Sequence, residues 1–405
     1  MTSEHDHVVS LRSEEATIPP GHSWNRIPVI GSACALLGVV GCAILGPANP
    51  KQFFFSWLMS YLFFLSLALG GLFFTLFMYA CQGGWGIVVR RVCETVFATI
   101  PVMATLFVPV LFGLHYLYPW SVPGAAEQDA LLRWKAPFLN VPFFLIRAAI
   151  YYICWSFIAL LYYRLSRGQD STGDFAVSAR LRKFAGPCII VLALTSTFAA
   201  IDWIVSLTPH WYSTMFGVYF FAGSFIGFIA LLSVVVPAMR GAGLLDTVIS
   251  AEHLHDLGKF LFAFTAFWAY IGFSQFFLIW YANLPEESFW FKARLEGSWE
   301  IVSLLLMAGH FGIPFFYLMG RAVKRRGWTL AIGGTWLLVM HFVDIYWQVM
   351  PTLHPEGVRP SVLDIATFLA VGGCFVAAAG WLMRRQALVP LRDPRLAESL
   401  MFENA

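Results

Sequence analysis

The feature that most constrains this chain is an uncharged stretch, residues 260–282, that is rich in aromatic and aliphatic side chains. Three titratable residues stand directly before it: His255, Asp256 and Lys259. Pro285 follows shortly after it, and the residue before a proline disfavours helical backbone. A helix needs about 20 apolar residues to cross the hydrocarbon core of a bilayer. The stretch therefore predicts a membrane-spanning helix with ionisable residues at its N-terminal end.

Nine further stretches resemble this one, and turn residues or charges separate them. The composition agrees, because the chain is 59% hydrophobic and 12% charged, whereas soluble domains carry about 25% charged residues. The sequence thus predicts an all-α integral membrane protein with ten transmembrane helices. The expected spans are residues 27–46, 53–81, 92–117, 142–165, 184–207, 212–238, 256–282, 298–320, 328–350 and 362–383.

The lysines and arginines predict the orientation. With ten spans, eighteen of them fall on the side of the N-terminus and six on the other side. Because cytoplasmic loops are enriched in Lys and Arg, both termini are expected in the cytoplasm. Residues 1–26 are polar and contain no early apolar run, so they do not read as a secretory signal peptide. The net charge of +3 gives no reason to expect a nucleic-acid partner.

The eight middle helices read as an internal repeat of two four-helix units. Asp202 in the fifth span and Asp344 in the ninth are each followed seven residues later by a proline, Pro209 or Pro351. We therefore expect two four-helix bundles, helices 2–5 and 6–9, flanked by helices 1 and 10. The expected divisions are a cytoplasmic tail (1–26), flanking helix 1 (27–50), the first bundle (51–211), the second bundle (212–351), and flanking helix 10 with a cytoplasmic tail (352–405).

Charged side chains inside a membrane are costly, so each one needs a partner or a role. Arg147 and Asp202 are each about five residues from the outer end of their helix, which places them at one depth. A neutralising pair and a functional role both remain open for them. Glu94 opens the third span in the first unit much as Asp256 opens the seventh span in the second.

The second unit offers no such arginine within its helices and instead combines acids with histidines. His310 lies about 18 Å into its span, close to mid-membrane. Because imidazole both accepts and donates a proton near neutral pH, this spacing suits a proton relay. The alternative is a histidine hydrogen-bonded to its neighbours. The relay candidates are Asp344, His341, Glu300 and His310, entered through His255, Asp256 and Lys259, with Tyr270, Ser274 and Gln275 as intermediate steps.

Cofactor sites have weaker support. The seven cysteines form no CxxC or CxxCH motif, so we expect them to pack as small apolar residues. A b-type haem between His310 and His341 is disfavoured by their different depths, and no metal site or catalytic set is expected. A quinone pocket needs a hydrogen-bonding side chain in an aromatic, membrane-facing cleft. Weak candidates for it are Tyr61, His115, Tyr116 and Trp203, beside Asp202.

One longer segment carries a family resemblance. The run HDLGKFLFAFTAFWAYIGFSQFFLIWYANLPEES at residues 255–288, together with the ten-helix plan, resembles the NrfD-like family of polysulfide-reductase membrane subunits. More narrowly, the chain is similar to the smaller of the two such subunits in bacterial alternative complex III, the ActF type. The resemblance extends over nearly the whole chain.

The resemblance implies a place in the bacterial inner membrane, in a menaquinol:cytochrome c or electron-acceptor oxidoreductase of an electron-transport chain. It implies that a larger sister subunit oxidises the quinol, while this chain supports assembly and supplies proton half-channels without being an enzyme alone. Asp202 and Asp344 would serve the outer side, and Glu94 and Asp256 the cytoplasmic side. The implied partners are the NrfD-like sister subunit, a multihaem c-type cytochrome, a monohaem cytochrome c, an iron–sulfur subunit related to molybdopterin enzymes, small membrane subunits and lipid.

All redox centres, haem c and iron–sulfur clusters, would then belong to the partners, and this chain would hold no cofactor. Three other functions stay open at this point. The chain could bind quinol in its own right, serve purely as a scaffold, or work as a free-standing transporter. Discontinuous helices at a repeat interface would favour the transporter, and here prolines interrupt only a few spans, at Pro101, Pro109 and Pro314.

Overall fold

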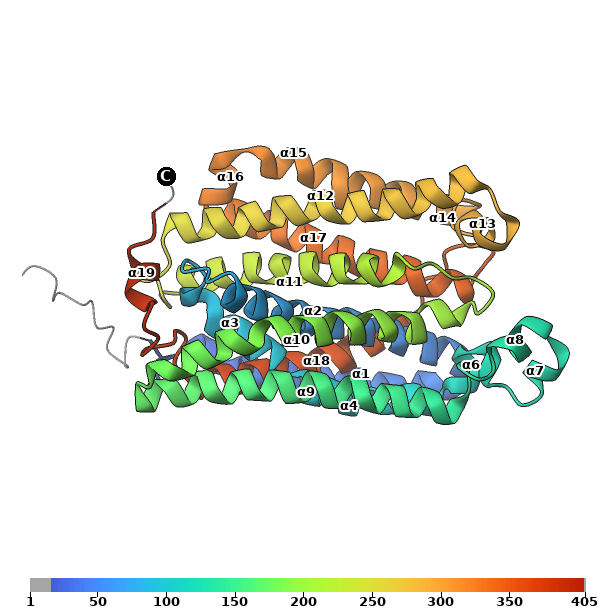
Figure 1. Ribbon diagram of the computed structural model, residues 1–405, viewed down its shortest axis with the longest axis horizontal. Coiled ribbons are helices and arrows are strands. Elements are labelled where there is room, and N and C mark those ends of the chain that lie inside the picture. Colours follow the sequence, from blue (N-terminus) through green and yellow to red (C-terminus); the bar gives the residue numbers. More distant parts are fainter. Residues whose placement is uncertain (1–15, 404–405) are drawn as a thin grey trace, which may run out of the picture.

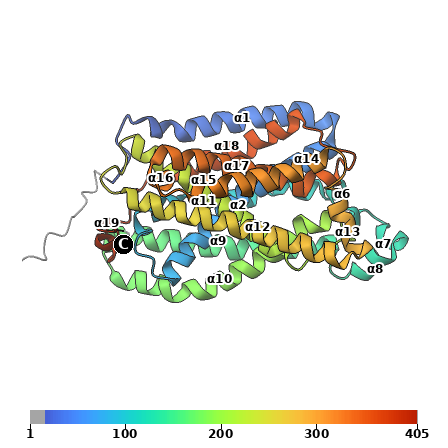
Figure 2. The ribbon, with the colours of Figure 1, turned by 90° about the horizontal axis from the view of Figure 1, so that it is seen from above.

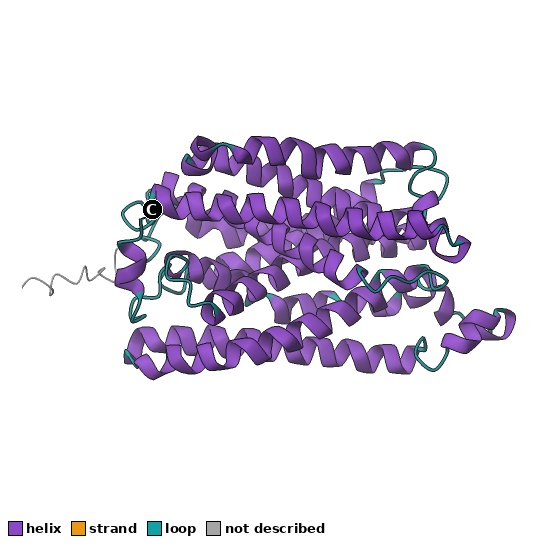
Figure 3. Ribbon diagram, turned by 45° about the horizontal axis from the view of Figure 1, so that its top comes forward, coloured by secondary structure: helices purple, strands orange, loops and turns teal. Residues whose placement is uncertain are grey.

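The computed structural model describes residues 16–403, which are 79% helical and contain no β-strand. Ten helical stretches within this range are long and apolar enough to cross a membrane, which confirms the predicted all-α, ten-span class. The stretches run side by side, with connections at the two ends of the bundle (Figure 3). The first fifteen residues of the expected N-terminal tail lie outside the described range.

The spans follow the expected order with small differences at their ends. They are α1 (Ile27–Leu45), α2 (Pro50–Ala80), the broken helix α3 (Ile87–Phe97), α4 (Ile100–Leu106) and α5 (Val108–Phe112), α9 (Val141–Thr172), α10 (Phe175–Trp203), α11 (Phe216–Gly241), α12 (Ala251–Ala282), the interrupted helix α14 (Ser298–Leu305) and α15 (Ile313–Met319), α17 (Gly327–Val349) and α18 (Val362–Met383). We call α2–α10 the first half and α11–α17 the second half.

Short helices mark the two ends of the bundle (Figure 1). One end, the loop end, carries α6 (Leu114–Leu117), α7 (Ala125–Gln128), α8 (Ala130–Lys135) and α13 (Pro285–Lys292). The opposite end, the tail end, carries α16 (Arg321–Arg325), α19 (Leu396–Leu400) and the C-terminal residues. The segment 384–403 lies across the tail end, and Leu388 there bonds to the carbonyl of Ala16.

The core of the bundle lies between α2 and α11. These two spans are the most buried, and α2 contacts α3, α10, α11, α17 and α18. The helices α1 and α18 pack along each other at one edge (Figure 2). Gly38 permits that approach, because a Cβ atom there would lie 2.6 Å from the carbonyl oxygen of Ala366. Small residues at close-packing spacing thus join the two flanking helices to each other.

Two spans are interrupted, the same two in which Pro101, Pro109 and Pro314 were expected to break the helix. The third span breaks into α3, α4 and α5, because Pro101 and Pro109 lack the amide hydrogen that helix continuation requires. The eighth span contains a π-helical segment, Leu306–Gly312, before Pro314 restores the α-helix. Single π-helical turns inside α-helices frequently mark functional sites. His310 lies in this segment.

Candidate functional site

The loop end of the first half contains a closed ion pair. Arg147 on α9 donates two hydrogen bonds of 2.8 Å to the carboxylate of Asp202 on α10, and Tyr151 adds a third at 2.7 Å. The remaining Arg147 donor bonds to the carbonyl of Phe138, whose ring lies 3.9 Å from the guanidinium. The pairing expected from their shared depth is therefore present. Asp202 is fully buried, and its carboxylate accepts three hydrogen bonds, two of them from a cation.

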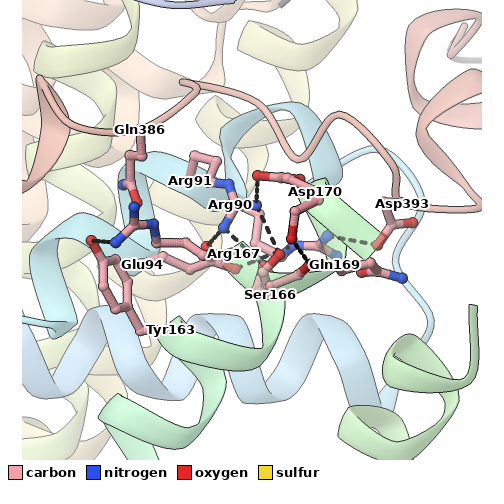
Figure 4. A network of polar contacts seen from close by, with 12 residues as sticks. Arg90, Arg91, Glu94, Tyr163, Ser166, Arg167, Gln169, Asp170, Gln386 and Asp393 are labelled. Carbon is pink, nitrogen blue, oxygen red and sulfur yellow. Dashed lines mark hydrogen bonds and ion pairs between the residues drawn. The ribbon is translucent and has the colours of Figure 1, made fainter. Parts of the chain in front are cut away.

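The tail end of the first half contains a larger ionic cluster (Figure 4). Glu94 on α3 lies 2.5 Å from Arg91 and 3.5 Å from Arg90. Arg91 also pairs with Asp170 at the end of α9, and Arg90 pairs at 2.6 Å with Asp393 of the C-terminal segment. The expected cytoplasmic acid of the first half is thus held between two arginines.

Sequence reasoning identified Glu94 but missed its partners. The spacing of Arg90, Arg91 and Glu94 at three and four residues within one helix was a usable signal. Asp393 lies about 300 residues away along the chain, and no local pattern predicts that contact. Asp393 is outside the spans, and its pKa is lowered: burial opposes ionisation, but Arg90 and three hydrogen bonds outweigh it.

Asp344, the counterpart of Asp202 in the second half, is held only by neutral groups. Asp344 on α17 is fully buried and accepts hydrogen bonds from the hydroxyl of Tyr219 on α11, at 2.5 Å, and from the indole of Trp268 on α12, at 3.2 Å. Across residues 16–403, no lysine or arginine forms an ion pair with this carboxyl. A buried carboxyl without a cation takes up a proton more readily than one held in an ion pair, because burial disfavours its charged form and no positive charge opposes this.

Two buried histidines lie beside Asp344. His341, one helical turn before it on α17, bonds through Nε2 to the hydroxyl of Ser66 at 2.7 Å. His310 in the π-helical segment has no hydrogen-bond partner at either ring nitrogen, and its ring centre lies 3.9 Å from that of Trp268. His341 and Asp344 both lie against Gly223, since a Cβ atom there would be 3.3 Å from the His341 ring and 3.4 Å from the Asp344 carboxylate. Asp344, Trp268 and the two histidines therefore form one contiguous group at the centre of the second half.

The structure separates four other relay candidates from this group. Glu300 is exposed, because Trp299 occupies the buried face of the first turn of α14. Tyr270 is 65% exposed and faces away from the bundle, since two residues along a helix turn its side chain away from Trp268. Ser274 is half-buried, and His255 lies near the tail end with one ring nitrogen unpaired. Glu300 and Tyr270 therefore lie outside the buried group around Asp344, and their part in a relay stays a prediction.

Two of the residues at which protons were expected to enter, Asp256 and Lys259, lie close together at the tail end. Asp256 is buried and pairs with the half-exposed Lys259, one turn further along α12. Asp256 precedes Trp268 by twelve residues, about 18 Å along the helix. Thr265 lies between them but bonds to its own helix backbone. The structure thus places Asp256 and Asp344 toward opposite ends of the second half, as expected for acids that face the two sides of a membrane.

The second half also contains a buried arginine that sequence reasoning missed. Arg294, in the connection between α13 and α14, is 2% exposed. Its guanidinium bonds to the carbonyls of Trp290, Trp347 and Gln348, at 2.9 to 3.1 Å. Burial lowers its pKa, but a guanidinium stays protonated in proteins. The expectation that the second unit offers no buried arginine comparable to Arg147 therefore overlooked Arg294.

The weak quinone candidates do not form one pocket. Tyr61 and Trp203 are buried inside the first half and pack on Phe107. His115 and Tyr116 are exposed on α6 at the loop end. A cavity of about 660 Å³ lies instead in the second half, between α12 and the eighth span. Its lining includes Tyr219, Trp268, Gln275, Ser303 and Trp347 among mainly apolar side chains.

Across residues 16–403, no three His, Cys, Asp or Glu side chains gather in a way that would hold a metal ion. Comparisons with protein-family models and with curated protein sequences gave no match. Function is therefore inferred from the geometry of the buried polar groups and from the resemblance of residues 255–288.

Proposed function

We propose that this chain is a membrane subunit of a bacterial quinol-oxidising complex of the alternative complex III type, and that its second half carries protons. One observation supports this choice above the others. The buried acids of the first half, Glu94 and Asp202, are each locked to arginine, whereas Asp344 is held by neutral donors beside two histidines. Of these three buried acids, Asp344 is the one without a cation among the described residues; Asp364 on α18, outside both halves, is likewise held by neutral groups, Gln52 and Ser56.

In this proposal protons enter at Asp256 and Lys259, pass the histidines at mid-membrane, and leave through Asp344 toward the loop end. The step between Asp256 and His310 needs water, because Thr265 between them bonds to its own helix backbone and the stretch 260–264 is apolar. The first half acts as scaffold, since its ion pairs hold α3, α9 and α10 together. Redox centres, c-type haem and iron–sulfur clusters, belong to the partner subunits, and both termini of this chain face the cytoplasm.

The assembly is tested by purifying a tagged version of the chain in mild detergent, followed by mass spectrometry and a dithionite-reduced spectrum. We expect c-type haem and a second NrfD-like subunit to copurify with quinol:cytochrome c activity. A colourless chain that elutes alone, under conditions that keep other membrane complexes intact, would overturn the assembly and favour a transporter. The two interrupted spans do not favour the transporter, because the third and eighth spans hold different positions in their two halves.

A second candidate function, quinol binding by this chain itself, has one observation in its favour. The cavity beside α12 opens among exposed side chains such as Phe273 and Met307, so only bilayer-soluble molecules reach it. Gln275 is 4% exposed, lines the cavity, and has an amide oxygen without a hydrogen-bond partner. An apolar pocket with a few directed polar groups is the usual form of a ligand site.

Photolabelling with an azidoquinone distinguishes quinol binding by this chain from quinol binding by the sister subunit. Labelled peptides from 266–276 and 303–315 would support a quinol site, and Gln275→Leu should then reduce labelling at least tenfold. Labelling confined to the sister subunit would reject it. Glu300→Gln provides a control, because Glu300 lies on the same span but outside the cavity lining.

A further inference from the structure

Arg294 is a buried cation without an acid. Its guanidinium stacks on the ring of Trp290 at 3.4 Å and lies 5.3 Å from the ring of Trp347. All three of its hydrogen bonds go to main-chain carbonyls, and in the described part of the chain it forms no ion pair with a carboxylate. Burying a charge is expensive unless an opposite charge compensates it. The bonds from Arg294 to main-chain carbonyls therefore do not by themselves explain why a charged side chain is buried at this position.

Asp344 is an acid without a cation, and it lies close by. Arg294 bonds to the carbonyls of Trp347 and Gln348, which are three and four residues after Asp344 on α17. One turn of α-helix advances about 5.4 Å. Tyr219, whose hydroxyl bonds directly to Asp344, lines the same cavity as Trp290 and Trp347, the two rings nearest the Arg294 guanidinium. The buried cation of the second half therefore bonds to the end of α17, at carbonyls three and four residues beyond the acid that lacks a cation.

The first half shows the same two residue types in contact. Arg147 stacks on Phe138 and bonds to its carbonyl, as Arg294 stacks on Trp290 and bonds to its carbonyl. The difference is that Arg147 also holds the carboxylate of Asp202. In this protein, a guanidinium that stacks on an aromatic ring at the loop end can therefore also form a bidentate bond to a carboxylate. In the first half, that carboxylate lies near the end of the last helix.

We propose that Arg294 is the counter-charge of Asp344: when the Asp344 carboxyl loses its proton, the guanidinium turns from the carbonyls of α17 to the carboxylate. This rests on the proposed function, in which Asp344 changes protonation. The O–H bond of Asp344 breaks, the proton passes to water on the loop side, and no electron is transferred. Arg294 then carries the charge that makes the ionised acid tolerable inside the protein, and it returns to the carbonyls when a new proton arrives.

The other titratable groups around Asp344 are Tyr219 on α11, His341 on α17 and His310 in the π-helical segment, and α12 contributes only the neutral Trp268. None of these is a permanent cation. Arg294 is therefore the group whose removal should most affect the ionisation of Asp344. It is a positioning and charge-compensating residue, and its role is separable from its bonds to the backbone.

The test is an infrared titration of the purified complex, with the protonated carboxyl band of Asp344 identified by its loss in Asp344→Asn. In Arg294→Gln, which keeps amide donors for the carbonyls but no charge, the band should persist to a pH about one unit or more above the wild-type midpoint. Arg294→Lys should restore most of the wild-type midpoint. Lys292→Gln is the matched control, because it removes an exposed charge two residues away and should leave the midpoint unchanged.

An unchanged midpoint in Arg294→Gln would overturn the proposal and reduce Arg294 to a helix cap. If that variant does not fold, isotope-labelled arginine in the otherwise unaltered protein decides. Its guanidinium band should then change across the Asp344 midpoint, and should not change in Asp344→Asn. An unchanged band would again overturn the proposal. The infrared titration does not measure proton translocation. A complex that moves no protons would therefore reject the proposed function, and the titration would still decide whether Arg294 compensates the charge of Asp344.

Discussion

Tyr219 donates a hydrogen bond of 2.5 Å to Asp344, and in doing so links α11, the central helix of the second half, to the last helix of that half. Tyr61 occupies the comparable place in the second span, within SYLFF at 60–64 as Tyr219 lies within VYFFA at 218–222. The hydroxyl of Tyr61 has no partner, however, and the acid of the first half is bound by Tyr151 and Arg147 instead. The two halves share a plan but only one leaves its acid free of a cation.

Replacing Asp344 by Asn, or His310 by Ala, should lower proton translocation at least about tenfold and leave quinol oxidation largely intact. A positioned proton-transfer group contributes roughly 10²–10⁴-fold to a rate, and an amide cannot replace it. The measurement is the proton-to-electron stoichiometry of the complex in liposomes. Glu300→Gln should have no effect, because Glu300 faces outward. Unchanged stoichiometry in both variants would leave the relay hypothesis without support.

Replacing Arg147 by Met should lower the free energy of unfolding by about 3–5 kcal/mol, because it leaves the carboxylate of Asp202 buried without its partner. The measurement is denaturation in detergent, followed by tryptophan fluorescence. The double variant Arg147→Met, Asp202→Leu should recover most of the loss, since no buried charge remains. A loss below about 1 kcal/mol in the single variant would mean that water reaches Asp202, contrary to its complete burial.

The number and order of the spans could be predicted because hydrophobic length is a local property of the chain. The Arg147–Asp202 pair was also predictable, since both residues lie on regular helices where depth follows from residue count. Arg294 was missed because it lies in the connection before α14, where residue counting gives no position. The Arg90–Asp393 contact was missed because it joins distant parts of the chain.

The exposure of Glu300 and Tyr270 was not predictable for a different reason. Residue counting gives depth along the membrane normal but not the direction in which a side chain points. Direction is read from an amphipathic pattern, and α12 has no charged face between residues 260 and 282. The same limitation hid the contact between Tyr219 and Asp344, which depends on how α11 and α17 pack, and the cavity beside α12.

The C-terminal segment should detach when Asp393 is neutralised. Arg90 lowers the pKa of Asp393 despite the opposing effect of burial, so the ionised carboxylate stabilises the docked segment. This contribution is fully present above the unfolded pKa of about 3.9 and is lost as the pH falls through the lower folded pKa. At neutral pH the attachment should therefore be insensitive to pH, and acid below about pH 4 should release the segment.

Asp393→Asn tests this without acid, with the rate of tryptic cleavage after Arg392 as the measurement. We expect cleavage several-fold faster than in the unaltered protein. Glu403→Gln serves as the control, because Glu403 is exposed and removes the same charge from the same segment. Equal cleavage rates in all three proteins would show that the segment is held by its other contacts, such as the bond between Ser399 and the carbonyl of Trp85.

Replacing Gly38 by Ala should push α1 and α18 apart and lower the free energy of unfolding by about 1–3 kcal/mol. The added Cβ would meet the backbone of Ala370 and lie 2.6 Å from the carbonyl oxygen of Ala366, and backbone atoms do not yield as a flexible side chain would. Gly168→Ala in α9 is the matched control, because a Cβ there meets no atom within 4 Å and alanine favours a helix over glycine. Denaturation in detergent should therefore separate the two variants in opposite directions. The helices α1 and α18 contribute no side chain to the Asp344 group. A folded Gly38→Ala protein should therefore retain the wild-type proton stoichiometry. A lower stoichiometry in this variant would show that the flanking helices position the second half.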